Sequence, residues 1–299
     1  MSTTETAAGR TQLDAYLADL QQMWSTFDDL YGSFSPVQWK RKFGKDWTYA
    51  DQPYHLAYFD REIVADPLEA GPDMPEEGRW KIITQRAIDE WNAREFAKRP
   101  AGQTPQESLA EWRHERERVR ALLQKFTDAD LGTYQVFGRL IGGQFIPLLI
   151  GIEGYRLHNW GELSELQWRL KRSTPELPRA ATQAAAGLYL GVLAQFCRAD
   201  VAKKPFTLGW EFIGSAGSSW TMRIADGECT LIAGSAQNPD LRLSMTPETF
   251  NIVMLRQAKN PMLAMLRGEM KVKGFSKMGM MKKLFVPDPD KEIKLPGMG

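Results

Sequence analysis

His55 and His158 are two of the chain's three histidines, and His158 raises the question of a metal site. His55 occurs early in an aromatic, apolar segment, and His158 lies in GYRLHNWGEL with Glu162 four residues after it. Residues four apart share one face of an α-helix, so His158 and Glu162 could offer an imidazole nitrogen and a carboxylate oxygen to the same ion. A divalent ion such as Zn²⁺ or Ni²⁺ held there would polarise a carbonyl or lower the pKa of a bound thiol.

The same residues also fit a structural role, or a pocket that binds without chemistry. Gly151, Gly154 and Gly161 share the helical stripe of His158, and a glycine inside a helix costs about 1 kcal/mol relative to alanine. Either close helix packing or space kept open for a ligand would explain this stripe. Two neutral imidazoles alone hold a divalent ion weakly, and buried histidines are commonly hydrogen-bonded to carboxylates or water. The residues leave these alternatives open.

Motifs and composition exclude several other classes of protein. The sequence contains no nucleophile elbow, phosphate-binding glycine loop, CxxC pair or HExxH motif, which weighs against classical hydrolases and nucleotide-binding enzymes. Lys and Arg number 38 against 37 Asp and Glu, so no net field attracts nucleic acid. Cys197 and Cys229 are too few for a disulfide framework and favour free thiols in a reducing compartment.

The chain also lacks the sequence signals of a membrane or secreted protein. Its first residues have no apolar signal-like core, and no uninterrupted apolar run reaches the roughly 18 residues that span a bilayer. We therefore expect a cytoplasmic protein without an integral membrane segment.

Helical periodicity dominates the first half of the chain. Apolar residues recur three or four positions apart in segments that we expect to be amphipathic helices, namely 13–31, 80–98 as an inserted helix, and 105–126. Pro53 begins a helix with His55 near its start, and the segment from Pro147 is long enough for about six turns that include His158. This pattern predicts a helical bundle over 11–172.

The period changes in the second half. A proline-bearing linker at 173–182 leads to an alanine-rich helix, after which apolar residues alternate in FTLGWEFI and in SSWTMRIADGECTLIAG. Asp226 and Gly227 predict a hairpin turn between two strands. A strand in PDLRLSM, a helix capped by Thr246, a short helix, a strand and a closing helix follow. We expect an α+β domain over 183–287, flanked by a flexible N-terminus at 1–10 and a tail at 288–299.

The first half resembles the DinB-like four-helix bundle, here with an inserted helix. The motifs that carry the likeness are SPVQWKRKFGKDWTYADQPYHL and the distant HNWGEL. The resemblance implies a metal site with His55 as first ligand, His158 as last ligand and Glu162 in the family's G–E step. The family's middle ligand would stand four residues before His158, where this chain has Gly154. The resemblance therefore implies a degraded site, unless Glu162 replaces the missing ligand.

The second half resembles the sterol carrier protein type 2-like fold. The blocks WTMRIADGECTLIAGSAQNPDLRLSMTPETFNIV and NPMLAMLRGEMKVKGFSKMGMMKKLF carry this likeness. It implies an antiparallel sheet packed with helices and an apolar ligand, such as a fatty acyl chain or a sterol, held between them. A similar domain follows the bundle in mycothiol-dependent maleylpyruvate isomerases, so the layout of the whole chain resembles theirs.

Candidate ligand-binding residues come from both halves. Six of the thirteen methionines lie between Met262 and Met281, which fits either a pliable apolar pocket or an ordinary core. The residues that we expect to contact the ligand are Trp47, Tyr58, Trp210, Phe212, Trp220, Met222, Leu243, Met245, Phe250, Met254, Met270 and Phe285. A basic cluster in the same stretch could meet a carboxylate or phosphate head group, or be solvated surface; it comprises Lys271, Lys273, Lys277, Lys282 and Lys283.

Three hypotheses for function follow. The leading one is a small-molecule binding protein that holds an apolar, acyl- or sterol-like ligand in its second domain, with His55 and His158 framing the site. The alternative is a metal- and thiol-dependent isomerase or transferase of the maleylpyruvate isomerase type. In a third, the bundle serves mainly as the interface of a homodimer. None of the three involves nucleic acid.

Overall fold

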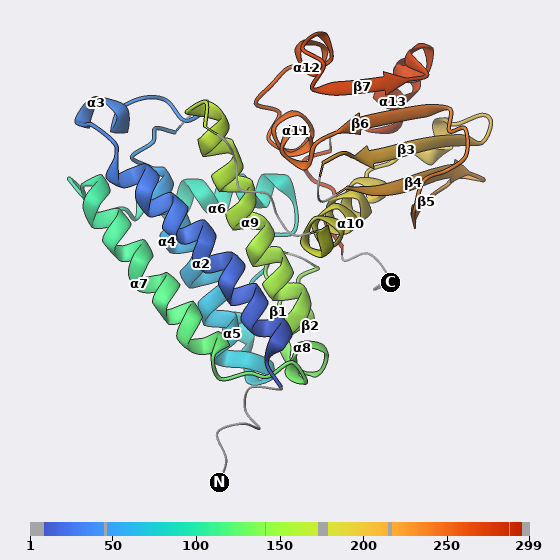
Figure 1. Cartoon of the computed structure of the whole chain (residues 1–299). Coiled ribbons are helices and arrows are strands. Elements are labelled where there is room, and N and C mark those ends of the chain that lie inside the picture. The colour runs from blue at the N-terminus through green and yellow to red at the C-terminus, as the bar shows by residue number, and fades with distance from the viewer. Residues whose placement is uncertain are drawn as a thin grey trace. The chain divides into compact units, whose positions relative to one another are not determined.

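The computed structural model describes residues 9–44, 47–140, 142–172, 179–214, 217–286 and 288–294, except for the side chains of 179–185. The chain divides into two compact units, 1–163 and 164–299 (Figure 1). Outside the described residues lie 1–8 of the expected N-terminal segment, 173–178 of the expected linker and 295–299 of the expected tail. Within the part of the chain that is described, no helix combines the length and apolarity needed to cross a bilayer.

The first unit is helical. Its elements are α2 (Thr11–Gly32), α3 (Pro36–Trp39), α4 (Gln52–Phe59), the π-helix η1 (Asp60–Ala65), α5 (Asp66–Ala70), the 3-10 turns η2 (Gly71–Asp73) and η3 (Glu76–Gly78), α6 (Gln85–Ala97), α7 (Pro105–Leu123), α8 (Asp130–Thr133), the strands β1 (Gln135–Phe137) and β2 (Phe145–Pro147), and α9 (Leu148–Arg169). Figure 1 shows α2, the continuous α4–η1–α5, α7 and α9 running alongside one another as a bundle. The expected four-helix architecture is confirmed.

Local sequence signals explain where these helices begin. The side chain of Thr104 caps α7 in a capping box with Glu107, and Pro105 occupies the first turn. Pro53, the second residue of α4, likewise lies in the first turn of its helix. The apolar stripe of α2 is buried as its spacing predicts, through Leu13, Tyr16, Leu20, Met23, Trp24, Phe27, Leu30 and Tyr31.

The inserted helix is shorter than its apolar pattern predicts. It begins at Gln85 rather than Trp80, because the Thr84 side chain accepts a hydrogen bond from the Ala87 amide and caps the helix there. Trp80 belongs instead to the preceding loop, where its ring lies under the Arg139 guanidinium at 4.2 Å. The antiparallel pair β1–β2, three residues a strand, has no counterpart in the sequence prediction.

The second unit is a sheet with helices. Beyond the end of α9, its elements are α10 (Arg179–Gln195), η4 (Ala199–Val201), β3 (Phe206–Phe212), β4 (Ser218–Ala225), β5 (Glu228–Ala233), β6 (Leu241–Met245), α11 (Pro247–Phe250), the π-helix η5 (Asn251–Leu255), α12 (Pro261–Leu266), β7 (Met270–Lys273), η6 (Phe275–Lys277) and α13 (Met278–Leu284). The strand order is β5-β4-β3-β6-β7. The pair β3–β6 is parallel, and the other pairs are antiparallel.

The turn between β4 and β5 follows its predicted chemistry. Asp226 and Gly227 both have positive φ, 54° and 81°, and join Ala225 to Glu228 in a two-residue hairpin. Two successive positive φ angles characterise the type I′ turn, which asparagine, aspartate and glycine tolerate best. The hairpin prediction is confirmed, and its turn fixes the register of the two strands.

Candidate metal centre

Helices α4 and α9 bring together the three residues that the sequence offers as metal ligands. One ligand atom each from His55, His158 and Glu162 can be chosen so that all three lie within 4.8 Å of one another. Oxygen Oε1 of Glu162 lies 4.0 Å from Nε2 of His55 and 3.7 Å from Nε2 of His158. The carboxylate and the His158 imidazole share a helical face, as their four-residue spacing predicts.

A hydrogen-bond chain sets the tautomer of His55. The Tyr58 hydroxyl donates its single proton to Oδ1 of Asn92 at 2.7 Å, and Nδ1 of His55 lies 2.7 Å from the same hydroxyl. Because the hydroxyl proton is already used, Nδ1 must carry the proton and donate to the Tyr58 oxygen. In the neutral form of the ring, Nε2 of His55 is then the unprotonated nitrogen, and it lies 4.0 Å from Oε1 of Glu162.

Burial keeps the Tyr58 hydroxyl protonated. Desolvation, reinforced by the Glu162 carboxylate, raises the pKa of Tyr58 far above its ordinary value. The phenol therefore remains a donor to Asn92 at every physiological pH. The orientation of the His55 ring follows from a network that does not itself titrate.

A hydrogen bond to Oε2, the second carboxylate oxygen, holds the side chain of Glu162 in place. Nε2 of Gln52 donates to Oε2 at 3.2 Å, and Oε1 of Gln52 accepts a hydrogen bond from the Tyr31 hydroxyl at 2.9 Å. Gln52 is fully buried and Glu162 is 2% exposed. A carboxylate this deeply buried calls for a positive partner, and the imidazoles or a bound cation can supply one. The arrangement leaves Oε1 directed at the two histidines.

Aromatic rings hold the imidazoles. The Phe59 ring stacks on His158, with ring centroids 3.5 Å apart and planes 1° apart. The Trp47 ring lies against His55, with centroids 4.8 Å apart. Both contacts restrict rotation of the imidazoles, which are therefore positioned before any ion arrives.

The glycine stripe of α9 has two different explanations. A Cβ atom on Gly151 would lie 3.2 Å from Cγ2 of Val136, so close packing explains this glycine. Gly154, at the position of the family's middle ligand, instead lines an apolar cavity of about 70 Å³ together with Phe59 and Tyr155. Packing and open space thus each account for one residue of the stripe.

The neighbouring carboxylate Glu153 plays no part in the cluster. It accepts a hydrogen bond from the Tyr16 hydroxyl at 2.7 Å and pairs with Arg156 at 2.5 Å. Its position five residues before His158 predicts that it points away from the imidazole, and these partners confirm it.

A second buried acid lies one residue after Phe59. Oδ2 of Asp60 accepts hydrogen bonds from Nε1 of Trp112 at 2.8 Å and from the Tyr155 hydroxyl at 2.7 Å. Complete burial raises the pKa of Asp60 to about 7, although both hydrogen bonds oppose the shift. Asp60 therefore exchanges a proton near neutral pH, beneath a tyrosine that lines the cavity.

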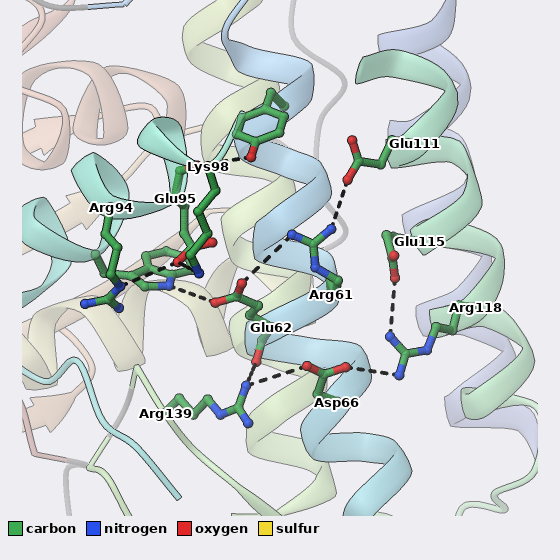
Figure 2. A network of polar contacts seen from close by, with 12 residues as sticks. Arg61, Glu62, Asp66, Arg94, Glu95, Lys98, Glu111, Glu115, Arg118 and Arg139 are labelled. Carbon is green, nitrogen blue, oxygen red and sulfur yellow. Dashed lines mark hydrogen bonds and ion pairs between the residues drawn. The ribbon is translucent and has the colours of Figure 1, made fainter. Parts of the chain in front are cut away.

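Ion pairs hold the helix that carries His55 against its neighbours (Figure 2). Links to α7 include the ion pairs Arg61–Glu111 at 2.9 Å and Asp66–Arg118 at 3.0 Å. Links to α6 include the hydrogen bond from Trp91 Nε1 to Glu62 Oε2 at 3.0 Å. Arg139 also donates to the backbone carbonyl of Glu62. These contacts fix the rotation of α4–η1–α5 about its axis, and therefore the direction in which His55 points.

The expected ligand-binding residues separate into two groups. Trp47 and Tyr58 lie beside His55 in the first unit. The other ten belong to the second unit and lie in or against its hydrophobic core, namely Trp210, Phe212, Trp220, Met222, Leu243, Met245, Phe250, Met254, Met270 and Phe285.

Several residues of the site escaped the sequence prediction. Gln52 stands three residues before His55, one helical turn away, and this spacing could have suggested it. Tyr31, Phe59 and Asn92 reach the site through contacts between different helices. No local sequence pattern predicts contacts between different helices.

Comparison with known families agrees with the two units. The DinB superfamily model matches residues 19–150, and the SCP-2 sterol transfer family model matches residues 197–285. The chain is a DinB-like bundle followed by an SCP-2-like domain. His55 falls within the DinB match, whereas His158 and Glu162 lie just beyond its end. No curated protein matches the chain in sequence.

Solved structures similar to the chain are distant from it. The mycothiol-dependent maleylpyruvate isomerase is 12% identical, with a TM-score of 0.45 over 80% of this chain and 87% of its own. A single-residue mutant of that enzyme is 11% identical over the same shares, with a TM-score of 0.46. The stereoselective inverting sec-alkylsulfatase Pisa1 from Pseudomonas sp. is 17% identical, with a TM-score of 0.29 over 81% of this chain. The chain spans 34% of the length of that sulfatase, and 25% of a double mutant of it.

Proposed function

We propose that the DinB-like bundle binds a divalent transition metal ion, Zn²⁺ or Ni²⁺, through His55, His158 and Glu162, and that the bound ion serves as a Lewis acid for a small organic substrate. The observation that carries this proposal is the convergence of three ligand atoms within 4.8 Å, from two helices in which His55 stands 103 residues before His158. Glu162 thereby supplies the third ligand that Gly154 cannot.

The residues present fit a metal ion. Imidazole nitrogens and a carboxylate oxygen are ligands that Zn²⁺ and Ni²⁺ accept, and three protein ligands leave a coordination position open, as in catalytic sites. The proton on Nδ1 of His55 leaves Nε2 as the donor atom, and the hydrogen bond to Tyr58 is the outer contact that typically orients a ligating histidine. The hydrogen bond from Gln52 orients the Glu162 carboxylate in the same way.

A metal ion bound here would polarise a carbonyl or lower the pKa of a thiol. The chain's own residues would supply position and environment. Glu162 brings a buried negative charge, and Phe59 excludes water from one face of His158. The apolar cavity beside Gly154 and Tyr155 has room for a small apolar fragment of the substrate. An isomerase or transferase that uses a thiol is the reaction class that we favour.

Metal analysis tests the proposal directly. Purified protein dialysed against Zn²⁺ or Ni²⁺, then against buffer alone, should retain about one ion per chain by elemental analysis. The double variant His55→Ala, His158→Ala should retain none. His114→Ala is the matched control, because His114 is the remaining histidine and is exposed on α7, and this variant should bind as the wild type does. Absence of a retained ion in the wild type, or an equal loss in the control, would contradict the proposal.

A second candidate function concerns the SCP-2-like domain, which we propose to hold an apolar small molecule that carries an oxygen acceptor. Trp210 and Trp220 face each other across β3 and β4, and side chains at paired positions lie on the same side of a sheet. In the described part of the chain, neither of their buried indole N–H groups has an acceptor. A ligand oxygen would satisfy groups that are costly to leave unpaired.

Native mass spectrometry tests this second function. A retained organic molecule, or uptake of a fatty acid or a sterol added to the purified protein, should accompany the intact chain. Trp210→Phe removes one donor while keeping an aromatic ring, and should weaken uptake. A chain that stays ligand-free after exposure to such molecules would contradict this function without bearing on metal binding.

A further inference from the structure

Large apolar side chains are concentrated on one part of the SCP-2-like domain's surface. Met262, Leu263 and Leu266 on α12 are 52%, 40% and 81% exposed, and Phe275 in η6 is 57% exposed. The other large exposed apolar residues of the described chain are dispersed, at Val37, Ile213, Ile232 and Val286. Four such side chains within fourteen residues form a concentration that folding alone does not require.

These residues lie along one edge of the sheet. Strand β7 is the last strand in the order, α12 precedes it and packs against it, and η6 follows it after Gly274. Figure 1 shows α12, β7 and α13 together at that end of the domain. We call the exposed side chains of residues 262–283 in these elements the edge surface.

The edge surface is strongly basic. Its exposed cations are Arg267, Lys271, Lys273, Lys277, Lys282 and Lys283. Among the described residues, none of these cations has a carboxylate within ion-pair distance. Glu269 is the only acidic residue between 256 and 286, and it pairs with the buried Lys259. Six uncompensated charges thus gather in a chain whose overall charge is +1.

Strand geometry presents two of the lysines outward. Lys271 and Lys273 alternate along β7 with Met270 and Val272, which pack in or against the hydrophobic core. Because successive side chains of a strand point to opposite faces, both ammonium groups project from the face away from the core. Long lysine side chains can also follow apolar surface while their charges stay in water.

We propose that the edge surface docks the protein onto the head groups of an anionic lipid bilayer. Protruding leucine, methionine and phenylalanine side chains enter the interface between head groups and acyl chains, while the surrounding lysines attract acidic lipids. Each lysine or arginine near such a surface strengthens binding about fivefold at moderate salt. An acidic protein partner would match the charge, but protruding apolar residues on a short helix and a turn suit insertion into a bilayer better.

Vesicle sedimentation tests the docking. The full-length protein should sediment with vesicles of phosphatidylcholine mixed with phosphatidylglycerol, and at least about tenfold less with phosphatidylcholine alone. Raising the salt concentration should release most of the bound protein, because the attraction between charges is screened. Equal binding to both kinds of vesicle, or to neither, would overturn the proposal.

Matched variants separate the two contributions. Lys271→Glu with Lys273→Glu should lower binding to anionic vesicles about tenfold or more, whereas Lys203→Glu with Lys204→Glu, which reverses two other exposed lysines, should not. Leu266→Asp with Phe275→Asp should also weaken binding. Ile232→Asp, on the opposite edge strand β5 and 48% exposed, is the apolar control and should have no effect.

Two further measurements complete the test. The double variant His55→Ala, His158→Ala should bind vesicles normally, so that failure of metal binding and failure of docking can be told apart. A DNA duplex should compete only weakly. If the duplex binds the protein as tightly as the vesicles do, and Leu266→Asp with Phe275→Asp leaves vesicle binding unchanged, the surface is a general polyanion site and the docking proposal is wrong.

Discussion

The imidazole of His158 lies flat on the ring of Phe59, with centroids 3.5 Å apart and planes 1° apart. Phe59 belongs to α4 and follows His55 by four residues, so the helix that carries one imidazole also orients the other. The stacking fixes the His158 ring plane relative to α4. In the metal site that we propose, the two histidines therefore act as one preformed unit.

The first prediction concerns the hydrogen bond behind Glu162. Gln52→Ala removes the donor to Oε2 and should weaken Zn²⁺ or Ni²⁺ binding about tenfold to a hundredfold, as removal of an outer contact to a ligand typically does. Isothermal titration calorimetry measures the affinity. Gln12→Ala removes a glutamine that bonds to Tyr16 elsewhere in the bundle and serves as the control. An unchanged affinity in Gln52→Ala would show that Glu162 needs no such support, or is not a ligand.

The second prediction concerns the pH dependence of stability. Burial raises the pKa of Asp60 to about 7 from an ordinary value of 3.8. Between these pH values the folded protein keeps a proton that the unfolded chain releases, so the free energy of unfolding falls as the pH rises and levels off above about pH 7. The full effect is on the order of 4 kcal/mol.

Asp60→Asn removes this titration while it keeps an oxygen acceptor for Trp112 and Tyr155. Urea unfolding at about pH 5 and about pH 8 should therefore show a smaller loss of stability on raising the pH in the variant than in the wild type. Equal pH dependence in both proteins would mean that Asp60 does not titrate near pH 7 in the folded protein.

The third prediction separates the two glycines of α9. Gly154 lines the cavity, so Gly154→Ala should stabilise the bundle by about 1 kcal/mol through the higher helix propensity of alanine. Gly151→Ala should gain less or lose stability, because its new methyl group would approach Val136 to 3.2 Å. Chemical unfolding of both variants gives the comparison. A gain for Gly151→Ala equal to that for Gly154→Ala would contradict the packing at Val136.

The fourth prediction concerns the two free thiols of the SCP-2-like domain. A hydrogen bond from the Cys229 thiol lowers the pKa of Cys197, and nearby Lys291 adds to this shift. The same hydrogen bond raises the pKa of Cys229, and burial of this thiol raises it further. Because the thiolate is the reactive form, iodoacetamide should alkylate Cys197 first, as peptide mass spectrometry would show. Lys291→Ala should slow that reaction, and equal rates at both cysteines would refute the assignment.

Much of the fold could be predicted because the decisive signals are local. Proline and threonine at helix starts, as at Pro53 and Thr104, mark the helix boundaries with side chains that act within one turn. Asp226 and Gly227 specify their hairpin in the same way. Alternation of apolar residues in 206–213 predicts a strand whatever its neighbours are.

What escaped prediction depends on distant partners or on single residues. The parallel pairing of β3 with β6 joins segments more than thirty residues apart, and no residue in either strand specifies it. The link from Tyr31 to Gln52 crosses between two helices. The spacing of His158 and Glu162 identified two of the three candidate metal ligands, and family resemblance supplied His55. The close approach of His55 to both is seen only in the assembled bundle.

The π-helix η1 has a consequence for how this chain can vary. A π-helical turn contains one residue more than an α-helical turn, and such a bulge shifts the phase of everything that follows by about 100°. Residues 52–59 upstream hold the imidazole that faces Glu162, and Asp66 downstream holds α7. Deleting one residue from 60–65 would restore a regular α-helix. It would also rotate one end of the helix relative to the other, so that either His55 would no longer face Glu162 or Asp66 would no longer pair with Arg118. The irregular turn thus constrains the length of this helix as strictly as the proposed metal site constrains the identity of His55.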